Sequence, residues 1–400
     1  MNDKTIVRLP SAVKELMEKL HSHGFSVYAV GGCVRDSLLG KSAFDWDMTT
    51  SALPEEMKAV FADYKTIDIG ISHGTVGVLK DGDVYEITTF RTDGTYTDSR
   101  HPDSVSFTRS LSEDLKRRDF TVNAMAYSEA DGLIDLFDGQ KDLKNGVIRT
   151  VGAPLERFTE DALRILRGLR FASTLGFEIE NETLAAMREK ANTLSFVSAE
   201  RKKEEIGKLL CGKAAARVVK ENAWVLAKAW KGLSEDRAKN NAELLGCLPY
   251  ALALRLAAIM DGEDPTKVPA QLFEYRFDKK TAALVGDILL AKSKMPCKTP
   301  PEFKRLLGEH GETACLAAVE LFEAKSADFA PEHKQMFTKL LNLNACVRLS
   351  QLQISGKDLL AHVQGREVGR VLNALLDAVI CEKTENEKTA LLAYAQKHLV

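Results

Sequence analysis

Two aspartates, Asp45 and Asp47, are separated by one residue and follow a glycine-rich stretch, Tyr-Ala-Val-Gly-Gly-Cys-Val-Arg-Asp, over residues 28–36. Residues i and i+2 of a strand point to the same face, so the two carboxylates can share a divalent metal. Gly31 and Gly32 stand where an apolar strand ends, and glycines there let backbone N–H groups approach a phosphate at the start of a helix. A phosphate cradle beside paired carboxylates indicates metal-assisted nucleotidyl transfer.

Metal ligation is the chemistry that we predict for Asp45 and Asp47, because hard divalent cations prefer carboxylate oxygens. Two Mg²⁺ ions held there would activate an attacking hydroxyl and stabilise the oxygen of the leaving pyrophosphate. Glu86, in the strand-like run 84–90, is a candidate third ligand. An ordinary solvent-exposed strand position is the alternative interpretation of Glu86.

A second group of polar side chains lies within residues 160–171, Glu-Asp-Ala-Leu-Arg-Ile-Leu-Arg-Gly-Leu-Arg-Phe, whose apolar period predicts a helix. At 100° per residue, Asp161, Arg164 and Arg167 fall within an arc of about 120°. Asp161 and Arg164 would then be neighbours, with β-carbons about 5–6 Å apart. One interpretation is an intrahelical ion pair on a hydrated face.

The other interpretation is that Asp161 and Arg164 together imitate the edge of a base. Cytosine and adenine each place an amino donor beside a ring-nitrogen acceptor, which matches an accepting carboxylate beside a donating guanidinium. Guanine and uracil present the reverse order and would leave buried groups unpaired. Such a pair would select C and A without a nucleic-acid template.

The elements that must position these side chains fall into two regions. Residues 1–145 mix helices with short Val/Ile/Thr/Tyr-rich runs, and the runs 74–80 and 84–90 predict a hairpin. From about residue 150 onwards, Ala/Leu/Lys/Glu-rich helical periodicity replaces the strand pattern. We therefore predict an α+β fold, in which an N-terminal nucleotidyltransferase (palm-like) head with a mixed β-sheet precedes an all-helical neck, body and tail.

Composition narrows the class of protein. The 55 Lys and Arg residues nearly balance the 57 Asp and Glu residues, for a net charge of −2, so a nucleic acid would have to meet a local basic patch. Seven cysteines without a Cys-x-x-Cys pair favour reduced thiols and a cytoplasmic protein. The N-terminus has no signal-peptide pattern and no apolar run is long enough to cross a membrane, so we expect no membrane partner.

Five groups of residues, taken in order, resemble motifs A to E of the class II tRNA nucleotidyltransferase/poly(A) polymerase family. They are Gly31-Gly-x-Val-Arg-Asp36 with Asp45-x-Asp47, Arg117-Arg-Asp-Phe-Thr-Val-Asn-Ala124, Asp135-Leu-Phe-Asp-Gly139, Glu160-Asp-x-x-Arg164, and residues 198–210. Residues 354–360 and 386–392 are similar to tail segments of the bacterial CCA-adding enzymes. The resemblance therefore covers nearly the whole chain.

The resemblance implies template-independent addition of C, C and A to the 3′ end of tRNA from CTP and ATP, with release of pyrophosphate. It implies that Asp45 and Asp47 are the catalytic Mg²⁺ ligands and that Asp161 and Arg164 read the base. Arg118 and Asp119 would contact the sugar and phosphates of the nucleotide. The remaining nucleotide-binding residues would be Gly31, Gly32, Arg35, Asn123, Arg167 and Arg170.

The resemblance also suggests four domains and a surface for tRNA. The predicted domains are a catalytic head over 1–145, a neck with the nucleotide-reading helix over 146–212, a body over 213–300 and a tRNA-binding tail over 301–400. Residues 195–232 hold nine Lys or Arg against four Glu, which favours either a tRNA-binding patch or a solvated helix face. The residues predicted to contact tRNA are Arg201, Lys202, Lys203, Lys208 and Lys213, although Arg201 is also expected to brace the neck helices.

Members of this family add CCA, only CC, only A, or poly(A). Residues 68–76, Asp-Ile-Gly-Ile-Ser-His-Gly-Thr-Val, have the form typical of CCA-type members, which argues against a poly(A) polymerase. Residues 91–102 stand where the family has a flexible loop that helps to switch specificity from C to A, and an ordinary mobile connection is the alternative. We favour full CCA addition, with A-only addition as the rival.

Two rivals belong to other classes of protein. A non-catalytic RNA-binding protein on this scaffold would lack the metal carboxylates and the base-reading pair, which this chain keeps. An antibiotic-type nucleotidyltransferase would share the glycine turn and the Asp-x-Asp pair but would lack the base-reading helix and the long helical body. The sequence gives no sign of an obligatory protein partner.

Overall fold

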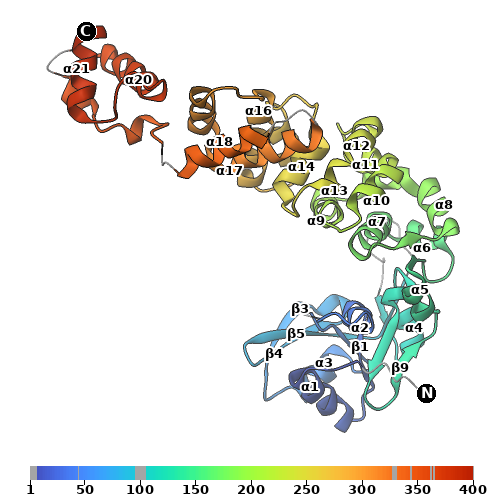
Figure 1. Ribbon diagram of the computed structural model, residues 1–400. Helices are drawn as coiled ribbons and strands as arrows, with labels where there is room; N and C mark the ends of the chain where they lie inside the picture. The colour runs from blue at the N-terminus through green and yellow to red at the C-terminus, as the bar shows by residue number, and fades with distance from the viewer. Residues whose placement is uncertain are drawn as a thin grey trace. The chain divides into compact units, whose positions relative to one another are not determined.

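The computed structural model describes residues 7–43, 45–94, 105–326, 331–342, 345–360, 363 and 365–399 (Figure 1). The chain forms two compact units, Met1–Glu235 and Asp236–Val400, which we describe separately. The predicted loop over residues 91–102 lies mostly outside the described residues.

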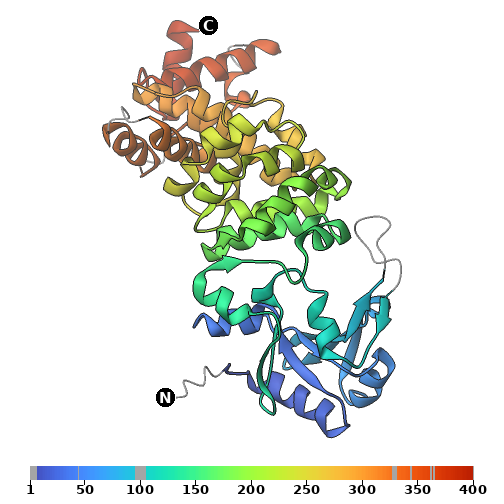
Figure 2. The same ribbon diagram turned by 90° about the vertical axis from the view of Figure 1, so that its right-hand side faces the viewer.

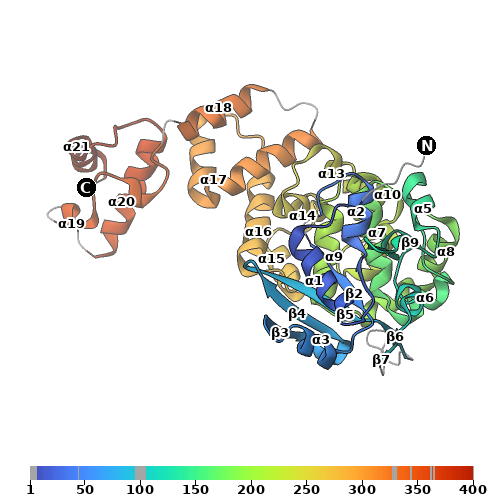
Figure 3. The ribbon, with the colours of Figure 1, turned by 90° about the horizontal axis from the view of Figure 1, so that it is seen from below.

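A seven-stranded sheet organises the first unit. Its order is β3-β4-β5-β2-β1-β8-β9. β2 and β5 pair in parallel and the other neighbours are antiparallel, so the predicted mixed sheet is confirmed. The predicted β4–β5 hairpin is also confirmed (Figure 3). The strands are β1 (Val27–Val30), β2 (Met48–Thr50), β3 (Lys65–Gly70), β4 (Thr75–Lys80), β5 (Asp83–Thr89), β8 (Met125–Ser128) and β9 (Gly132–Asp135).

Short helices and one small ribbon surround this sheet. α1 buries Leu16 and Leu20 completely and contacts both β1 and α3. α2 follows β1 directly and packs on β1, β8 and the 3₁₀ turn η2. These elements are α1 (Ser11–Ser22), α2 (Gly32–Leu38), α3 (Pro54–Val60), α4 (Leu111–Lys116), η2 (Thr121–Asn123), α5 (Gly139–Asn145) and the ribbon of β6 (Arg91–Asp93) with β7 (Val105–Phe107).

After β9 the rest of the first unit is almost entirely helical, as predicted (Figure 2). β10 and β11 form a two-stranded parallel pair. α7 packs closely on α9, and a β-carbon at Gly212, just beyond α9, would lie 2.1 Å from Ser173 Oγ of α7. The elements are β10 (Val147–Ile148), α6 (Pro154–Glu160), α7 (Leu163–Leu175), β11 (Glu178–Ile179), α8 (Asn181–Lys190), η3 (Ala191–Phe196), α9 (Ala199–Leu210), α10 (Ala215–Glu221) and α11 (Ala223–Ala229).

The second unit contains only helices and turns among its described residues. Towards its C-terminal end, Leu359, Val371, Leu375 and Leu391 form a small apolar core of their own. The elements are α12 (Glu235–Asn241), α13 (Leu244–Cys247), α14 (Leu252–Met260), α15 (Val268–Glu274), α16 (Lys279–Ser293), α17 (Pro300–Lys325), α18 (Pro331–Asn342), η4 (Leu349–Gln351), α19 (Gly356–Leu359), α20 (Arg366–Ile380) and α21 (Lys388–His398). Within the described ranges, none of these helices has the length and apolar content needed to cross a bilayer.

The structure divides the chain into two compact units, whereas the sequence predicted four domains. Its single division, after Glu235, falls inside the predicted body, and the four predicted domains therefore remain a prediction. Residues 296–301, at the predicted boundary between body and tail, join α16 and α17, which pack against each other within the second unit.

Candidate active site

The turn from β1 into α2 brings Arg118 close to the glycine motif. Gly31 has φ 81°, a backbone conformation that strains residues with a side chain. A β-carbon at Gly31 would also lie 3.4 Å from Arg118 Nη1. The backbone conformation therefore favours glycine here, and the 3.4 Å distance places the turn in ordinary contact with a guanidinium that can bind phosphate.

Asp45 and Asp47 lie on the exposed side of an extended segment that leads into β2. Trp46 between them and Met48 after them are buried, so exposed and buried residues alternate along this segment. Asp47 extends the pairing with β1, since its carbonyl accepts a hydrogen bond from the Val30 N–H at 3.0 Å. The predicted common face of the two carboxylates agrees with this pattern, although regular strand begins only at Met48.

Negative charge is concentrated around Asp47. Its carboxylate is open to solvent, yet the protein crowds around it, and this desolvation together with the charge of Asp45 raises its pKa to about 6. Arg118 lowers the pKa and Glu86 raises it further, so Glu86 lies near enough to act on Asp47. Among the described residues no three acidic, His or Cys side chains form a group that could enclose a metal ion, so Glu86 remains a predicted ligand.

A chain of buried polar contacts connects α2 to α7. Arg35 Nη1 donates to Asn123 Oδ1 at 2.6 Å, and Asn123 Nδ2 donates to Asp119 Oδ1 at 3.4 Å. Asp119 Oδ2 in turn accepts from Arg167 Nε at 2.7 Å. Burial alone would raise the pKa of Asp119, but Arg167 and Arg164 outweigh it and lower that pKa to about 2. Four predicted nucleotide-binding residues are thus brought together.

Asp114, on α4, is a site residue that the sequence reasoning missed. Its side chain is completely buried and accepts hydrogen bonds from Arg117 Nη2 at 2.8 Å and Arg118 Nη2 at 3.2 Å. It also accepts from Thr49 Oγ1 on β2 at 3.3 Å. Asp114 therefore fixes Arg118 relative to the strand that carries Asp47. An acid three or four residues before two adjacent arginines is the sequence signal that could have identified it.

The predicted helix over 160–171 is wrong in its first turn. α6 ends at Glu160, Asp161 is extended (φ −142°, ψ 105°), and α7 begins at Leu163. Asp161 Oδ1 accepts the N–H of Leu163 at 3.0 Å, so its side chain satisfies a free donor at the start of α7. Asp161 and Arg164 therefore stand at a helix junction and are not neighbours on one helix face.

Other protein groups bind both of the side chains that the sequence predicts to read the base. Arg201 on α9 donates to both oxygens of Asp161, at 3.3 and 2.7 Å. Arg164 pairs with Glu160 and donates from Nη2 to the carbonyl of Arg117 at 3.0 Å. The intrahelical ion pair between Asp161 and Arg164, which was the alternative interpretation, does not form. The bidentate contact of Arg201 with Asp161 is compatible with the bracing role expected of Arg201, which stays a prediction.

Three arginines gather around Phe171 of α7. The guanidinium carbons of Arg170, Arg35 and Arg167 lie 4.1, 5.3 and 5.4 Å from the ring centroid. Glu205 of α9 is buried and forms an ion pair with Arg170 at 3.0 Å. Burial lowers the pKa of Arg170, and Glu205 opposes that effect. Phe171 and Glu205 were not among the predicted site residues, because their contacts depend on α7 and α9 meeting in space.

The predicted tRNA-contact residues divide into two groups. Arg201 is engaged by Asp161, Lys202 is buried, and Lys203 pairs with Glu204 at 3.1 Å. Lys208 and Lys213 are exposed and remain available to a polyanion. Of the five residues predicted to contact tRNA, the structure therefore leaves Lys208 and Lys213 as the better candidates.

The mixed sheet with its carboxylate pair and arginine cluster has the organisation of a nucleotidyltransferase head. Residues 27–149 match the poly A polymerase head domain, residues 176–221 the probable RNA and SrmB-binding site of polymerase A, and residues 254–395 the putative domain 2 of tRNA nucleotidyltransferase. The CCA-adding enzyme of Lactococcus lactis subsp. cremoris (strain MG1363) is 39% identical over 96% of this chain and 95% of its own length. The chain belongs to the CCA-adding enzyme family and is a tRNA nucleotidyltransferase, as the sequence resemblance indicated.

Solved structures agree with this assignment. The CCA-adding enzyme of Bacillus stearothermophilus in complex with CTP is 34% identical, with a TM-score of 0.80 over 98% of both chains. The Thermotoga maritima CCA-adding enzyme complexed with tRNA shares the fold, with a TM-score of 0.70 at 21% identity over 98% of this chain and 96% of that one. The predicted fold class is confirmed.

Proposed function

We propose that this enzyme adds C, C and A in turn to the 3′ end of tRNA, using CTP and ATP, and that one site selects both bases. The observation that carries the proposal is the position of Asp161 and Arg164 at the α6–α7 junction, next to the chain of contacts through Asp119 and Arg167. The names of its relatives support CCA addition, and a solved relative binds CTP.

The reaction transfers a nucleotide and needs no covalent enzyme intermediate. The 3′-hydroxyl oxygen of the tRNA bonds to the α-phosphorus of the nucleotide, the bond from that phosphorus to the pyrophosphate oxygen breaks, and the hydroxyl proton passes to solvent. Arg118 and Arg35 bind and orient the negative triphosphate near the glycine turn. Asp119 holds Arg167 in place at the same end of the site.

A divalent cation fits the carboxylate pair. Asp45 and Asp47 offer hard oxygen ligands. Desolvation, followed by the charge of Asp45, raises the pKa of Asp47, and a bound cation would offset both effects. Mg²⁺, in two copies, is our proposed cofactor, and when bound it would lower the pKa of the attacking hydroxyl and stabilise the leaving oxygen.

Base selection follows from the donor and acceptor order at the junction. The amino group of cytosine or adenine donates to Asp161, and Arg164 donates to the ring nitrogen beside it. Uracil or guanine would place two acceptors or two donors together and leave a buried group unsatisfied, at a cost of about 1–3 kcal/mol. Discrimination of this size suits a site without a template.

Three tRNA transcripts, ending before CCA, after C and after CC, test the proposal. Each is incubated with CTP, ATP and Mg²⁺, and the products are sequenced. Growth to CCA on all three is the expected result. Extension of the CC-ended transcript alone would identify an A-adding enzyme, and long A-tails would identify a poly(A) polymerase.

A further inference from the structure

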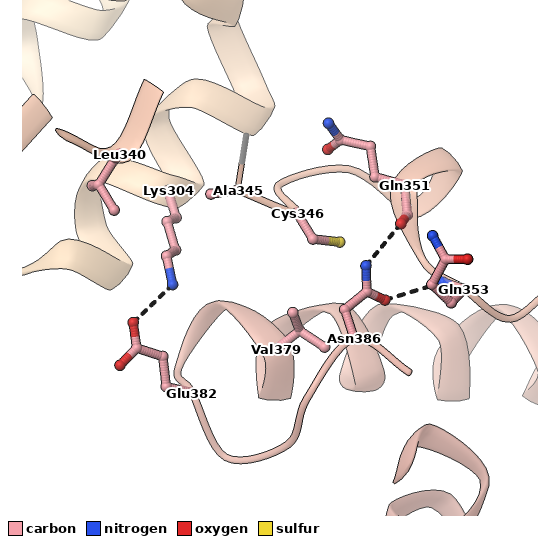
Figure 4. A pocket seen from close by; sticks show the side chains of 9 residues that line it. All are labelled: Lys304, Leu340, Ala345, Cys346, Gln351, Gln353, Val379, Glu382 and Asn386. Carbon is pink, nitrogen blue, oxygen red and sulfur yellow. Dashed lines mark hydrogen bonds and ion pairs between the residues drawn. The ribbon is translucent and has the colours of Figure 1, made fainter. Parts of the chain in front are cut away.

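A cavity of about 560 Å³ lies in the second unit, outside the site described above (Figure 4). Its lining comes from α17, α18, the segment 345–353, and the end of α20 with the turn that follows. Figure 4 shows Lys304 with Glu382 on one side and Asn386 with Gln353 on another, with the Cys346 thiol between them. None of these residues belongs to the predicted catalytic or nucleotide-binding set.

Lys304 and Glu382 offer a donor and an acceptor side by side. Lys304 is only 8% exposed, and its ammonium donates to Glu382 Oε1 at 3.0 Å and to the Ile380 carbonyl at 3.4 Å. An ammonium carries three N–H donors, so one remains for a ligand. The Glu382 side chain is 71% exposed and keeps its second oxygen open to the same ligand.

The backbone at Glu382 supports a role beyond structure. Glu382 has φ 58° and follows the last residues of α20, where the Lys383 N–H donates to the Ala378 carbonyl at 2.8 Å. Helices that end in this way usually carry glycine at the left-handed position, because other residues are strained there. A strained carboxylate at a cavity is the kind of outlier from which function can be inferred.

The rest of the lining suits a flat, neutral, polar ring. Asn386 fixes the segment opposite, since its Nδ2 donates to the Gln351 carbonyl at 2.9 Å and its Oδ1 accepts from the Gln353 N–H at 3.0 Å. Within the described residues the side-chain amide of Gln353 has no hydrogen-bond partner, so it can both donate and accept. Leu340 and Val379 supply apolar surface for the faces of a ring.

We propose that this cavity binds one unstacked nucleotide of the tRNA, with its base edge on the Lys304–Glu382 pair and on Gln353. Every base has a donor next to an acceptor on its edge, and proteins that recognise RNA commonly bind splayed-out bases in this way. The lysine charge is already balanced by Glu382, which suits a neutral base better than a free phosphate. The inference rests on the proposed function, because it takes tRNA as the ligand.

Two variants test the proposal by different routes. Ala345→Phe fills the cavity and leaves the Lys304–Glu382 pair intact. Glu382→Gly removes the acceptor; it relieves the left-handed backbone but leaves the buried Lys304 ammonium without its carboxylate, so its melting temperature is measured to establish that it folds. Asn373→Ala on α20, which removes an exposed amide outside the cavity, is the matched control. Full-length protein is titrated with a tRNA transcript, and steady-state kinetics are measured with CTP.

Both cavity variants should bind tRNA about tenfold more weakly, the scale expected for losing one bound base, with KM for tRNA raised and kcat unchanged. Asn373→Ala should match the wild type. Folded cavity variants that bind tRNA as tightly as the control would overturn the inference, and so would saturable binding of free cytidine or adenosine with unchanged tRNA affinity. These results can be told apart from failure of the proposed function, because in that case the wild-type enzyme itself would not extend tRNA.

Discussion

At the scale of single residues, the buried Trp46 explains how the two acids on either side of it, Asp45 and Asp47, stay on one surface. Its indole lies in the core and its Nε1 donates to the Ala43 carbonyl at 3.3 Å, which anchors the segment between Asp45 and Asp47. The two carboxylates therefore both point outward without a bound metal. Trp46, which has no catalytic group, fixes their position by anchoring the segment.

The double variant Asp45→Ala/Asp47→Ala should reduce incorporation of CMP and AMP to background, because no carboxylate pair remains to hold the metal. Binding of tRNA should change little, since it depends on other surfaces. Incorporation assays and a Mn²⁺ titration measure the two properties. Asp63→Ala, which removes an exposed acid paired with Lys19, is the control, and normal turnover in the double variant would refute the metal assignment.

Arg164→Ala should relax discrimination against UTP and GTP by about ten- to a hundredfold, the equivalent of one buried hydrogen-bonding group. The quantity to measure is kcat/KM for each of the four nucleotides on a CC-ended or C-ended tRNA. Arg188→Ala on α8 removes an exposed arginine outside the site and should leave selectivity as it is. Unchanged selectivity in Arg164→Ala would rule out base-edge reading by this residue.

At the scale of elements, α9 braces the α6–α7 junction, which we propose reads the nucleotide, at two points one turn apart. Arg201 holds Asp161, and Glu205 holds Arg170, so opposite charges at positions i and i+4 face α7 and the α6–α7 junction. The close packing of α7 on α9 makes these contacts rigid. The orientation of the Asp161 carboxylate therefore depends on the packing of this helix pair.

Arg201→Ala should lower kcat/KM for CTP and ATP by about tenfold and narrow their advantage over UTP, because Asp161 loses its orientation. Arg201→Lys should restore part of the selectivity, since one charged donor remains. Lys203→Ala on the same helix, which breaks only its pair with Glu204, is the control. A fall in melting temperature with unaltered selectivity would show that Arg201 only stabilises the fold.

The link between Asp119 and Arg167 predicts a pH dependence of stability. The folded-state pKa of Asp119 lies near 2, below its ordinary 3.8, so the ion pair contributes about 2 kcal/mol above pH 4 and loses that contribution as the pH falls towards 2. Asp119→Asn should therefore be less stable than the wild type at pH 5, with the difference shrinking in acid. Urea unfolding over this range measures it, and a constant difference would contradict the prediction.

The sequence predicted these elements unevenly. Asp45 and Asp47 share a face because strand residues alternate with a period of two, and the β4–β5 hairpin depends on its local turn residues. Both features could therefore be predicted from the sequence. The break at Asp161 could not, because residues 160–163 have ordinary helix propensity, and the break depends on contacts with Arg201 on α9. Glu205 was missed for the same reason, since its partner Arg170 on α7 meets it only in the folded chain. Asp114 was within reach of the sequence, because its partners Arg117 and Arg118 lie three and four residues further on.

At the scale of the whole molecule, a protein with a net charge of −2 must bind tRNA, which is strongly negative. Several of the basic residues are already paired with acids, as Arg201, Lys203 and Arg217 illustrate. The exposed Lys208 and Lys213 are therefore the better candidates for phosphate contacts. Recognition of the tRNA by its shape needs only a few such contacts to its phosphates.

Lys208→Ala/Lys213→Ala should weaken tRNA binding and flatten its dependence on salt by about one unit of slope for each lost phosphate contact. Binding isotherms over a series of salt concentrations measure the slope. Lys141→Ala/Lys144→Ala on α5 removes the same charge elsewhere on the surface. An equal change in both double variants would mean that only net charge matters, and no change would mean that this face does not meet tRNA.

The internal partners of Asp161 and Arg164 have a consequence for fidelity. If these two residues read the base as proposed, the nucleotide meets a carboxylate that Arg201 already orients and a guanidinium that Glu160 and the Arg117 carbonyl already orient. Little conformational entropy is then lost when a matching base binds, because the groups that bind it are in place beforehand. A mismatched base meets the same fixed groups and leaves them unsatisfied, so selection depends on an arrangement set before the nucleotide arrives.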